Sequence, residues 1–514
     1  MRIMMTTKMK TYSTLPKAGL YAVMLLLAGG CTLAPKYDRP DSPVAGTWPE
    51  MGVNVAPQEV DGIVASELRW QEFYGDERLK ALIALSLENN RDMRIAALNA
   101  EKARAMYQIQ RSELLPSVYA SGDLTRTTTG AGGRTPAEYS ETARTMGPGS
   151  RVYTASVGVV SYELDLFGRV RSLNQAALAN YFATVEAQKT SQISLVSAVA
   201  AGYYVLLADN ELVRLTEETL QTRLESLKLT QLKFEHGVSS ELDVRQAETL
   251  VESARSSLAQ LKRQYAEDQN TFEVLIGSAI PEDLPAGASF YTQNELMPEL
   301  SSGIPSEVLI RRPDIIAAEQ QLIAANANIG AARAAFFPQI SLTGTLGKAS
   351  DELSDLFSSG HFWRFTPSIS LPIFTGGRNV ANLEVAEAEQ KIAVAQYEKS
   401  IQTAFQEVSN ALAGRATYGE QLDAMTALVA ASKRAYELSD LQYRNGIASY
   451  MDLLDAQRTL YDAQQQQILA RLSMLNNQVT LYKVLAGGWS AEDEEKIIMS
   501  MQPASSEEAS DTQL

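Results

Sequence analysis

Two long segments of this 514-residue chain repeat each other, and this repeat constrains the fold more than any other feature of the sequence. The segment "RDMRIAALNAEKARAMYQIQRSELLPSVYASG" at 91–122 aligns with "PDIIAAEQQLIAANANIGAARAAFFPQISLTG" at 313–344, and Pro116 matches Pro338. A unit that recurs within one chain predicts two structurally similar copies rather than one irregular core.

A second set of matches follows each repeated segment at a smaller separation. Gly237 pairs with Gly446 and Asp243 pairs with Asp452, at an offset of 209 residues instead of 222. The first copy therefore holds extra residues between the two sets, and they fall in the Gly- and Thr-rich stretch 125–151. Length variation of this kind is typical of exposed loops.

Each copy is expected to run helix, strand, loop, strand and then a helical hairpin. The four predicted strands are 116–127, 152–165, 338–347 and 362–374. The third alternates clearly, because Ile340, Leu342 and Leu346 lie opposite polar neighbours. The apolar face of the fourth comprises Trp363, Phe365, Ile369, Leu371 and Ile373. Such two-faced segments of about ten residues match the strands of a membrane β-barrel, although a soluble hairpin fits the first two segments about as well.

The helical stretches are unusually long. Residues 169–233 and 378–442 contain no proline, so each could extend for roughly 100 Å at ~1.5 Å per residue. Apolar and alanine residues recur in alternating steps of three and four, as in the series Ile193, Val196, Ala200, Tyr203, Leu207 and the series Leu453, Ala456, Leu460, Ala463, Gln467, Ala470. This spacing predicts coiled-coil packing with close helix approach.

The first thirty residues have the pattern of an export signal. Basic residues precede the apolar run "AGLYAVMLLLA" at 18–28, which is too short to span a bilayer. The next small residues lead to Cys31, the only cysteine of the chain. A single thiol in this place is better explained as a lipid acceptor than as part of a disulfide framework, although Ala28-Gly29-Gly30 also suits ordinary signal cleavage at the same bond. No later window offers about 18 consecutive apolar residues, so any membrane entry is expected to use strands.

The domain organisation follows from these patterns. We expect a signal peptide at 1–30, a lipid-anchored N-terminal linker at 31–66, a first structural repeat at 67–290, a second at 291–490 and an acidic disordered tail at 491–514.

The sequence offers little for catalysis or for nucleic-acid binding. Its two histidines, His236 and His361, fall in a turn and a loop, which is too few for a histidine-based zinc site or a catalytic triad. No phosphate-binding or nucleophile-elbow motif occurs, and the net charge of −16 disfavours a polyanionic partner. We therefore expect no enzyme, no cofactor, no metal site and no nucleic-acid partner.

Four strands cannot close a barrel, and open sheet edges in lipid leave backbone groups unpaired at several kcal/mol each. Small membrane barrels begin at about eight strands, so more than one copy of the chain is required. Two copies would give a barrel filled by side chains, whereas three would leave a lumen.

Five dispersed motifs carry a family resemblance: "CTLAPKYDRP" (31–40), "YELDLFGRVR" (162–171), "IRRPDIIAAE" (310–319), "FFPQISL" (336–342) and "LPIFTGGRN" (371–379). The chain resembles the TolC-like outer-membrane efflux channels, and within them the lipoprotein branch of OprM- and NodT-type factors. The resemblance implies an α+β membrane channel: a homotrimer whose twelve-stranded β-barrel continues as a long periplasmic α-helical barrel. It also implies a lipid-anchored location in the outer membrane, in contact with its lipids and extending into the periplasm. Two protein partners are implied as well, a periplasmic membrane-fusion adaptor and an inner-membrane transporter of the resistance-nodulation-division (RND) type.

The repeated turns gain a role from this resemblance. From the residues alone, Gly237 and Gly446 end helices, while Ser240 and Ser449 cap the next helices together with Asp243 and Asp452. The resemblance implies that Asp452 and Asp455 form an acidic ring at a periplasmic aperture, that Tyr443 bonds to Asp243 and helps to close it, and that the turns dock the adaptor. A basic residue of some members is Ala448 here, and Arg444 is a possible substitute.

The expected function is a passive exit duct for drugs or other small molecules. Two alternatives remain open at this point: a periplasmic coiled-coil lipoprotein adaptor or scaffold, and an outer-membrane channel for type I protein secretion.

Overall fold

The computed structural model describes residues 32–45, 65, 68–126, 151–300, 311–358 and 360–488. The signal peptide, Cys31, most of the predicted linker and the acidic tail lie outside the described residues. The helices are α2 (Trp70–Phe73), α3 (Glu77–Asn89), α4 (Arg91–Ser112), α5 (Arg169–Glu235), α6 (Glu241–Ile276), α8 (Pro313–Ala334), α9 (Arg378–Arg444) and α10 (Tyr450–Val484), with short 3₁₀ turns at Gln293–Leu296 and Leu353–Asp355. The strands are β1 (Val118–Arg126), β2 (Arg151–Leu164), β3 (Gln339–Ser350) and β4 (His361–Ser370).

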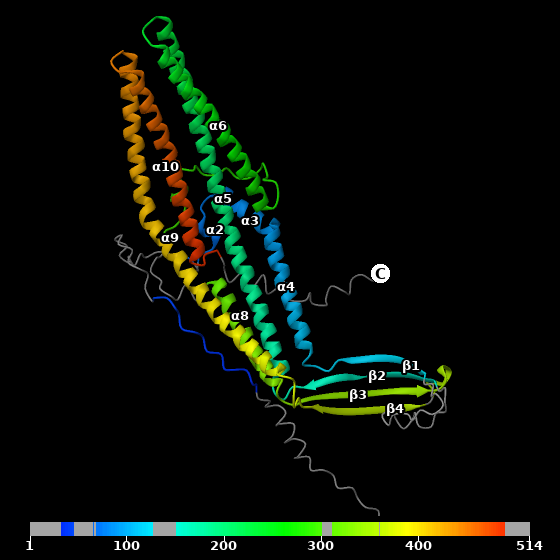
Figure 1. The fold of residues 1–514 in the computed structure, drawn as a ribbon. Helices are drawn as coiled ribbons and strands as arrows, with labels where there is room; N and C mark the ends of the chain where they lie inside the picture. Colours follow the sequence, from blue (N-terminus) through cyan, green and yellow to red (C-terminus); the bar gives the residue numbers. More distant parts are fainter. Residues whose placement is uncertain are drawn as a thin grey trace, which may run out of the picture. The chain divides into compact units, whose positions relative to one another are not determined.

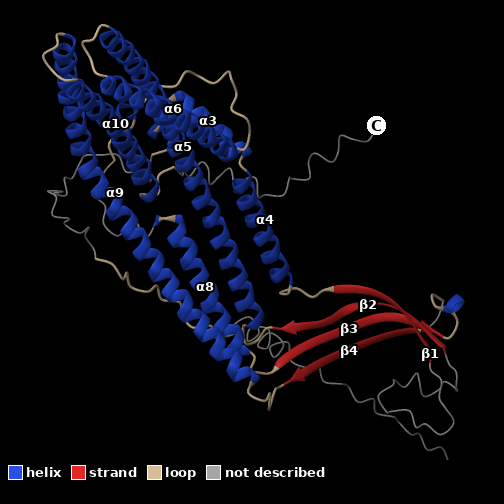
Figure 2. Ribbon diagram, turned by 45° about the horizontal axis from the view of Figure 1, so that its top comes forward, coloured by secondary structure: helices blue, strands red, loops and turns tan. Residues whose placement is uncertain are grey.

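The order of elements repeats, as the duplication predicts. The series α4-β1-β2-α5-α6 is followed by α8-β3-β4-α9-α10 (Figure 1). The chain forms two compact units: one comprises residues 103–181 and 320–394 with the N-terminal segment, and the other comprises 40–102, 182–319 and 395–514. The first unit holds all four described strands, and the second is helical (Figure 2).

The four strands form one antiparallel sheet in the order β1-β2-β3-β4. The predicted strand limits agree with the observed ones to within four residues. The fourth strand was predicted too long: it ends at Ser370, because Pro372 lacks the N–H that a ladder needs. Pro367 is tolerated within β4 because β4 is an edge strand.

The sheet separates apolar from polar side chains. Across β3 and β4 the register places Ile340 opposite Ile369 and Leu346 opposite Trp363, whereas Thr343 faces Thr366 on the other side. No described part of the chain covers these apolar side chains, since Trp363 is 78% exposed and Ile369 is 70% exposed. A single copy therefore presents an uncovered apolar surface.

A bulge explains why β2 alternates poorly in sequence. The register with β3 shifts between Val159 and Tyr162, and Ser161 adopts a positive φ of 55°. Before the extra residue, the odd-numbered residues of β2 lie on the apolar face, and after it the even-numbered ones do. Val157 and Val159 therefore share this face with Tyr162. The interruption in period two is thus a change of phase and not a loss of amphipathicity.

In the first unit, small residues bring helices close together. Ala176 and Ala179 of α5 pack against Ala324 and Ala327 of α8, and all four are buried. Close alanine packing is what the coiled-coil pattern predicts, because small side chains permit short interhelical distances.

The helical unit is held by buried aromatic and polar contacts. Phe73 stacks on Tyr482 with ring centroids 3.9 Å apart. Asp76 caps α3 through its Oδ1, and its Oδ2 accepts hydrogen bonds from Tyr203 Oη (3.0 Å) and Gln293 Nε2 (2.7 Å). Of the two predicted seams, Ile193, Val196, Ala200, Tyr203, Leu453, Ala463 and Ala470 are buried, whereas Leu207, Ala456, Leu460 and Gln467 are half-buried.

Among the described helices, only α5 has an 18-residue window with the length and composition of a membrane span, with a mean hydropathy of 1.5. Because 56% of that window is buried inside the protein, burial in the helical core accounts for its apolar character.

Candidate functional site at the helix turns

The two turns that join the long helices have the same backbone geometry. Gly237 and Gly446 both adopt φ of +73°. In the first turn the Val238 N–H bonds to the Lys233 carbonyl (2.8 Å), and in the second the Ile447 N–H bonds to the Gln442 carbonyl (2.9 Å). These are the long bonds of a Schellman motif, which requires the left-handed conformation that glycine adopts without strain.

Each turn ends in a complete capping box. The Ser240 hydroxyl accepts from the Asp243 N–H, and the Asp243 carboxylate accepts in return from the Ser240 N–H (3.0 Å). Ser449 and Asp452 repeat this arrangement, with the Ser449 hydroxyl also donating to Asp452 Oδ2 (2.7 Å). The capping roles read from the sequence are therefore confirmed.

The acidic residues differ in what they do within the chain. Burial alone would raise the pKa of Asp243, but hydrogen bonds from Ser240 and Ser239 outweigh it and hold the pKa below its ordinary value. Asp452 is exposed and its carboxylate is engaged by the cap. Asp455, one turn further along α10, is exposed and has no hydrogen bond or ion pair among the described residues. Of these three acids, Asp455 is thus the one whose carboxylate has no partner within the described part of the chain.

Tyr443 has a different partner from the one expected. Its hydroxyl hydrogen-bonds to Thr230 Oγ1 at 3.2 Å, and no bond to Asp243 occurs among the described residues. Lys233 donates to the Tyr443 carbonyl (2.8 Å) and lies 3.7 Å from the centre of its ring. Within one chain, Tyr443 therefore joins α9 to α5 through a threonine and a cation, while Asp243 is occupied by its own cap. Likewise Arg444 pairs with Asp440 of its own helix (2.7 Å) rather than with an acid of the other turn.

The contact of Tyr443 belongs to a polar seam that sequence reasoning missed. Toward the turn, α5 places polar residues at alternating steps of three and four: Thr216, Thr219, Arg223, Ser226, Thr230 and Lys233. Tyr461 of α10 repeats the arrangement of Tyr443, because its hydroxyl bonds to Thr216 Oγ1 (2.9 Å) and Arg223 lies over its ring at 5.2 Å. The signal was present as polar residues at coiled-coil core positions, where apolar residues are the norm.

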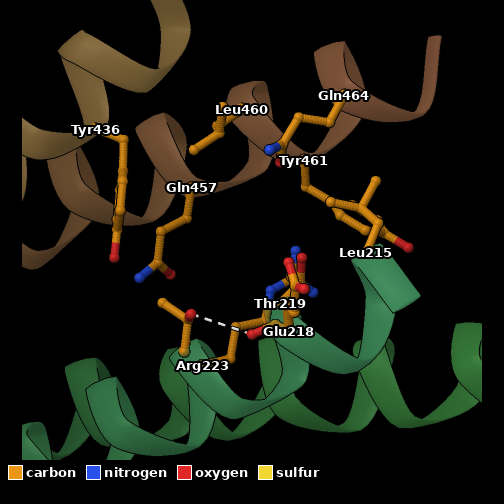
Figure 3. Close-up of a pocket in the computed structure, with 10 residues that line it drawn as sticks. Leu215, Glu218, Thr219, Arg223, Tyr436, Gln457, Leu460, Tyr461 and Gln464 are labelled. Atoms are coloured by element: carbon orange, nitrogen blue, oxygen red, sulfur yellow. Dashed lines mark hydrogen bonds between the residues drawn. The ribbon is translucent and has the colours of Figure 1, made fainter. Parts of the chain in front are cut away.

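A pocket of about 160 Å³ opens along this seam. Figure 3 shows it between the ribbon that carries Leu215 to Arg223, from α5, and the ribbon that carries Gln457 to Gln464, from α10. Tyr436 of α9 completes the lining. Arg223 donates through Nη1 to the Leu250 carbonyl of α6 (3.0 Å), and burial lowers its pKa.

The part of the chain that the structure describes contains no group of three or more His, Cys, Asp or Glu side chains suited to hold a metal ion. His236 follows the end of α5 and His361 begins β4, and both are exposed.

An antiparallel sheet with an exposed apolar face and long paired helices with capped turns are the features of a membrane channel protein. The chain belongs to the outer membrane efflux protein family, whose model matches residues 82–278 and 304–487. It is an outer-membrane efflux component. The expectation of a TolC-like outer-membrane factor is thus confirmed, and the alternative of a periplasmic adaptor is set aside.

Relatives match along nearly their whole length. A toluene efflux pump outer membrane protein of Pseudomonas putida, TtgC, is 48% identical over 469 residues, which cover 91% of this chain and 95% of the relative. The antibiotic efflux pump outer membrane protein ArpC of Pseudomonas putida gives the same identity and coverage. Among solved structures, the open state of the MtrE outer membrane channel of Neisseria gonorrhoeae is similar, with a TM-score of 0.77, 39% identity, and coverage of 89% of this chain and 98% of that one.

Proposed function

We propose that three copies of this chain close a twelve-stranded β-barrel in the outer membrane and form the passive exit duct of a tripartite, RND-type efflux pump. One observation carries the proposal: among the residues that the structure describes, nothing covers the apolar face of the four-stranded sheet, and its outer strands, β1 and β4, have no neighbour on one side. In lipid, each unpaired backbone group would cost several kcal/mol.

The strand directions permit closure. Since each neighbouring pair is antiparallel, β1 and β4 run in opposite directions, so β4 of one copy can continue the antiparallel pattern with β1 of the next. Cyclic association removes every edge. Three copies are favoured over two because twelve strands enclose a lumen, whereas about eight are filled by side chains.

The polar face of the sheet suits the wall of an aqueous lumen. Ser121 and Ser156 hydrogen-bond across β1 and β2 on that face (3.0 Å), and further along the sheet Thr343 accepts from the Ser161 N–H. A channel wall of this kind conducts without an energy source, and the driving step would belong to the inner-membrane transporter.

The turns are the proposed contact with the periplasmic adaptor. Gly237, Ser240, Gly446 and Ser449 give both turns one rigid shape, so the adaptor would meet two equivalent tips in each copy. Equivalent tips suit a partner that packs around the assembly as repeated helical hairpins.

The aperture is proposed to lie at the second turn. Asp452 and Asp455 of three copies would surround one axis and create a negative potential that favours cations and resists closure. The contacts of Tyr443 and Tyr461 with α5 would oppose opening, and adaptor docking would shift the balance toward the open state.

Acylated Cys31 would anchor the N-terminus in the membrane, with repeats at 67–290 and 291–490 following the linker.

Because relatives of 48% identity are named for toluene and for antibiotics, small apolar organic molecules are the proposed cargo, rather than secreted proteins.

The mass of the purified assembly and its conductance test the proposal together. In detergent, the protein part is expected at three times the mass of the chain without its signal peptide, somewhat below three times 56.1 kDa, and reconstitution into planar bilayers should give discrete single-channel currents. A monomer in mild detergent, or membranes that stay electrically silent, would overturn the trimeric duct.

A further inference from the structure

The pocket between α5 and α10 is lined by two residues that each carry a buried polar atom without a hydrogen-bond partner among the described residues (Figure 3). These atoms are Arg223 Nε and Gln457 Oε1. The residues themselves are only 5% and 7% exposed. Buried polar atoms are nearly always hydrogen-bonded, so two such atoms in one pocket indicate that something else binds there.

Arg223 forms no ion pair within the described part of the chain, although the charges of Arg458 and Asp462 act on it in opposite directions. Its contacts are the Leu250 carbonyl and the ring of Tyr461, and no carboxylate lies within ion-pairing distance. Glu218 is the acid that lines the pocket, but it pairs with Arg214 at 2.8 Å. A buried cation without an ion-pair partner favours an anionic ligand.

The opposite wall supplies an acceptor. Gln457 provides it, because its Oε1 has no hydrogen-bond partner among the described residues. Thr219 and Thr222 add hydroxyl groups to the lining from α5. One wall therefore offers donors and positive charge, whereas the other offers an oxygen that needs a donor. One water molecule needs only about 15 Å³, so a pocket of about 160 Å³ has room for a larger occupant.

We propose that this pocket binds a small oxyanion that also carries a hydroxyl group, with hydrogen phosphate as the simplest example. Its charged oxygens would accept from Arg223, and its P–OH would donate to Gln457 Oε1. Sulfate has the same shape but no hydrogen to donate at neutral pH, so it satisfies only one wall. The site is independent of the channel function, because binding requires no transport.

Calorimetric titration of the purified full-length protein in detergent tests this site, with inorganic phosphate and with sulfate at pH 7 and constant ionic strength. Phosphate is expected to bind saturably and at least tenfold more tightly than sulfate. Arg223→Met should weaken the binding of both anions by at least tenfold. Arg255→Met is the matched control, since Arg255 is exposed on α6 and pairs with Glu252, and it should bind as the wild type does.

Gln457→Met separates recognition from folding. It keeps the cation, so sulfate should bind as before while the preference for phosphate disappears. Absence of saturable binding to the wild type, or unchanged binding in Arg223→Met, would overturn the site. If Arg223→Met does not fold, Gln457→Met decides, and a phosphate preference that survives in it would also refute the proposal.

Discussion

At the scale of single residues, the turns show how one carboxylate can serve structure while its neighbour remains free. Asp452 completes a capping box, whereas Asp455 has no partner among the described residues. The sequence was sufficient for the caps, because Ser-x-x-Asp after a turn glycine is a local pattern. It was not sufficient for Tyr443, whose partner Thr230 is 213 positions away and depends on how two helices pack.

Substitutions at the second turn can separate the cap from the proposed acidic ring. Asp455→Ala is expected to lower cation selectivity in planar bilayers without changing thermal stability. Ser449→Ala should leave selectivity intact but cost about 1 kcal/mol through loss of the cap. Asp452→Ala should change both. Wild-type selectivity in Asp455→Ala would remove this residue from the ring.

The contact between Tyr443 and Thr230 is testable by a double-mutant cycle. Tyr443→Phe and Thr230→Val should each destabilise the protein by about 1 kcal/mol, because each removes one partner of a buried hydrogen bond. The double variant should cost less than the sum, with a coupling of about 0.5–1.5 kcal/mol in denaturant titrations. Additive losses would mean that the bond contributes nothing of its own.

At the scale of elements, the strands and helices could be read from periodicity, but their irregularities could not. A bulge at Ser161 changes the phase of β2, and period-two reasoning sees only a weakened alternation there. The polar seam of α5 is a similar case. Steps of three and four predict which residues lie at the helix interface, yet they do not say that Arg223 and Gln457 surround a pocket.

The contact between α5 and α6 should make stability depend on pH. Burial, and then a hydrogen bond with Asp268, raises the pKa of Asp209 from 3.8 to about 7. The folded state therefore holds this proton more tightly than the unfolded state does. Its contribution to stability is largest below about pH 4 and is lost as pH rises toward 7.

Asp209→Asn replaces the carboxyl group by an amide, which does not ionise, and so removes this pH-dependent contribution to stability. Thermal midpoints at pH 5 and pH 8 should differ less in this variant than in the wild type, and the variant should be the more stable protein at pH 8. Asp462→Asn, at an exposed position of α10, should keep the wild-type pH dependence. An identical pH profile in Asp209→Asn would show that Asp209 is ionised in the folded protein at both pH values.

At the scale of the whole molecule, the open edges of the sheet decide how copies associate. Pro367 fits in β4 without interrupting its pairing with β3, so its nitrogen faces the open edge. The nitrogen of Phe365, two residues earlier, faces the same way, because strand geometry repeats every second residue. Thr366 lies between them and directs its nitrogen toward β3.

Phe365→Pro should therefore leave the single chain folded and weaken its association. Light scattering in detergent is expected to show a shift from trimer toward monomer, with circular dichroism unchanged. Phe365→Leu should associate normally. Thr366→Pro should instead disturb the sheet itself and lower the yield of folded protein. A full trimer population in Phe365→Pro would argue against β4 as an intermolecular edge.

The unpaired edges of β1 and β4 have a genetic consequence. Because every copy would contribute strands to the same barrel wall, one copy with a mutated edge would inactivate a channel that also contains normal copies. In a cell that makes both the normal and the mutant chain, the fraction of non-functional channels would then exceed the fraction of mutant chains. Edge mutations in this gene should therefore be dominant.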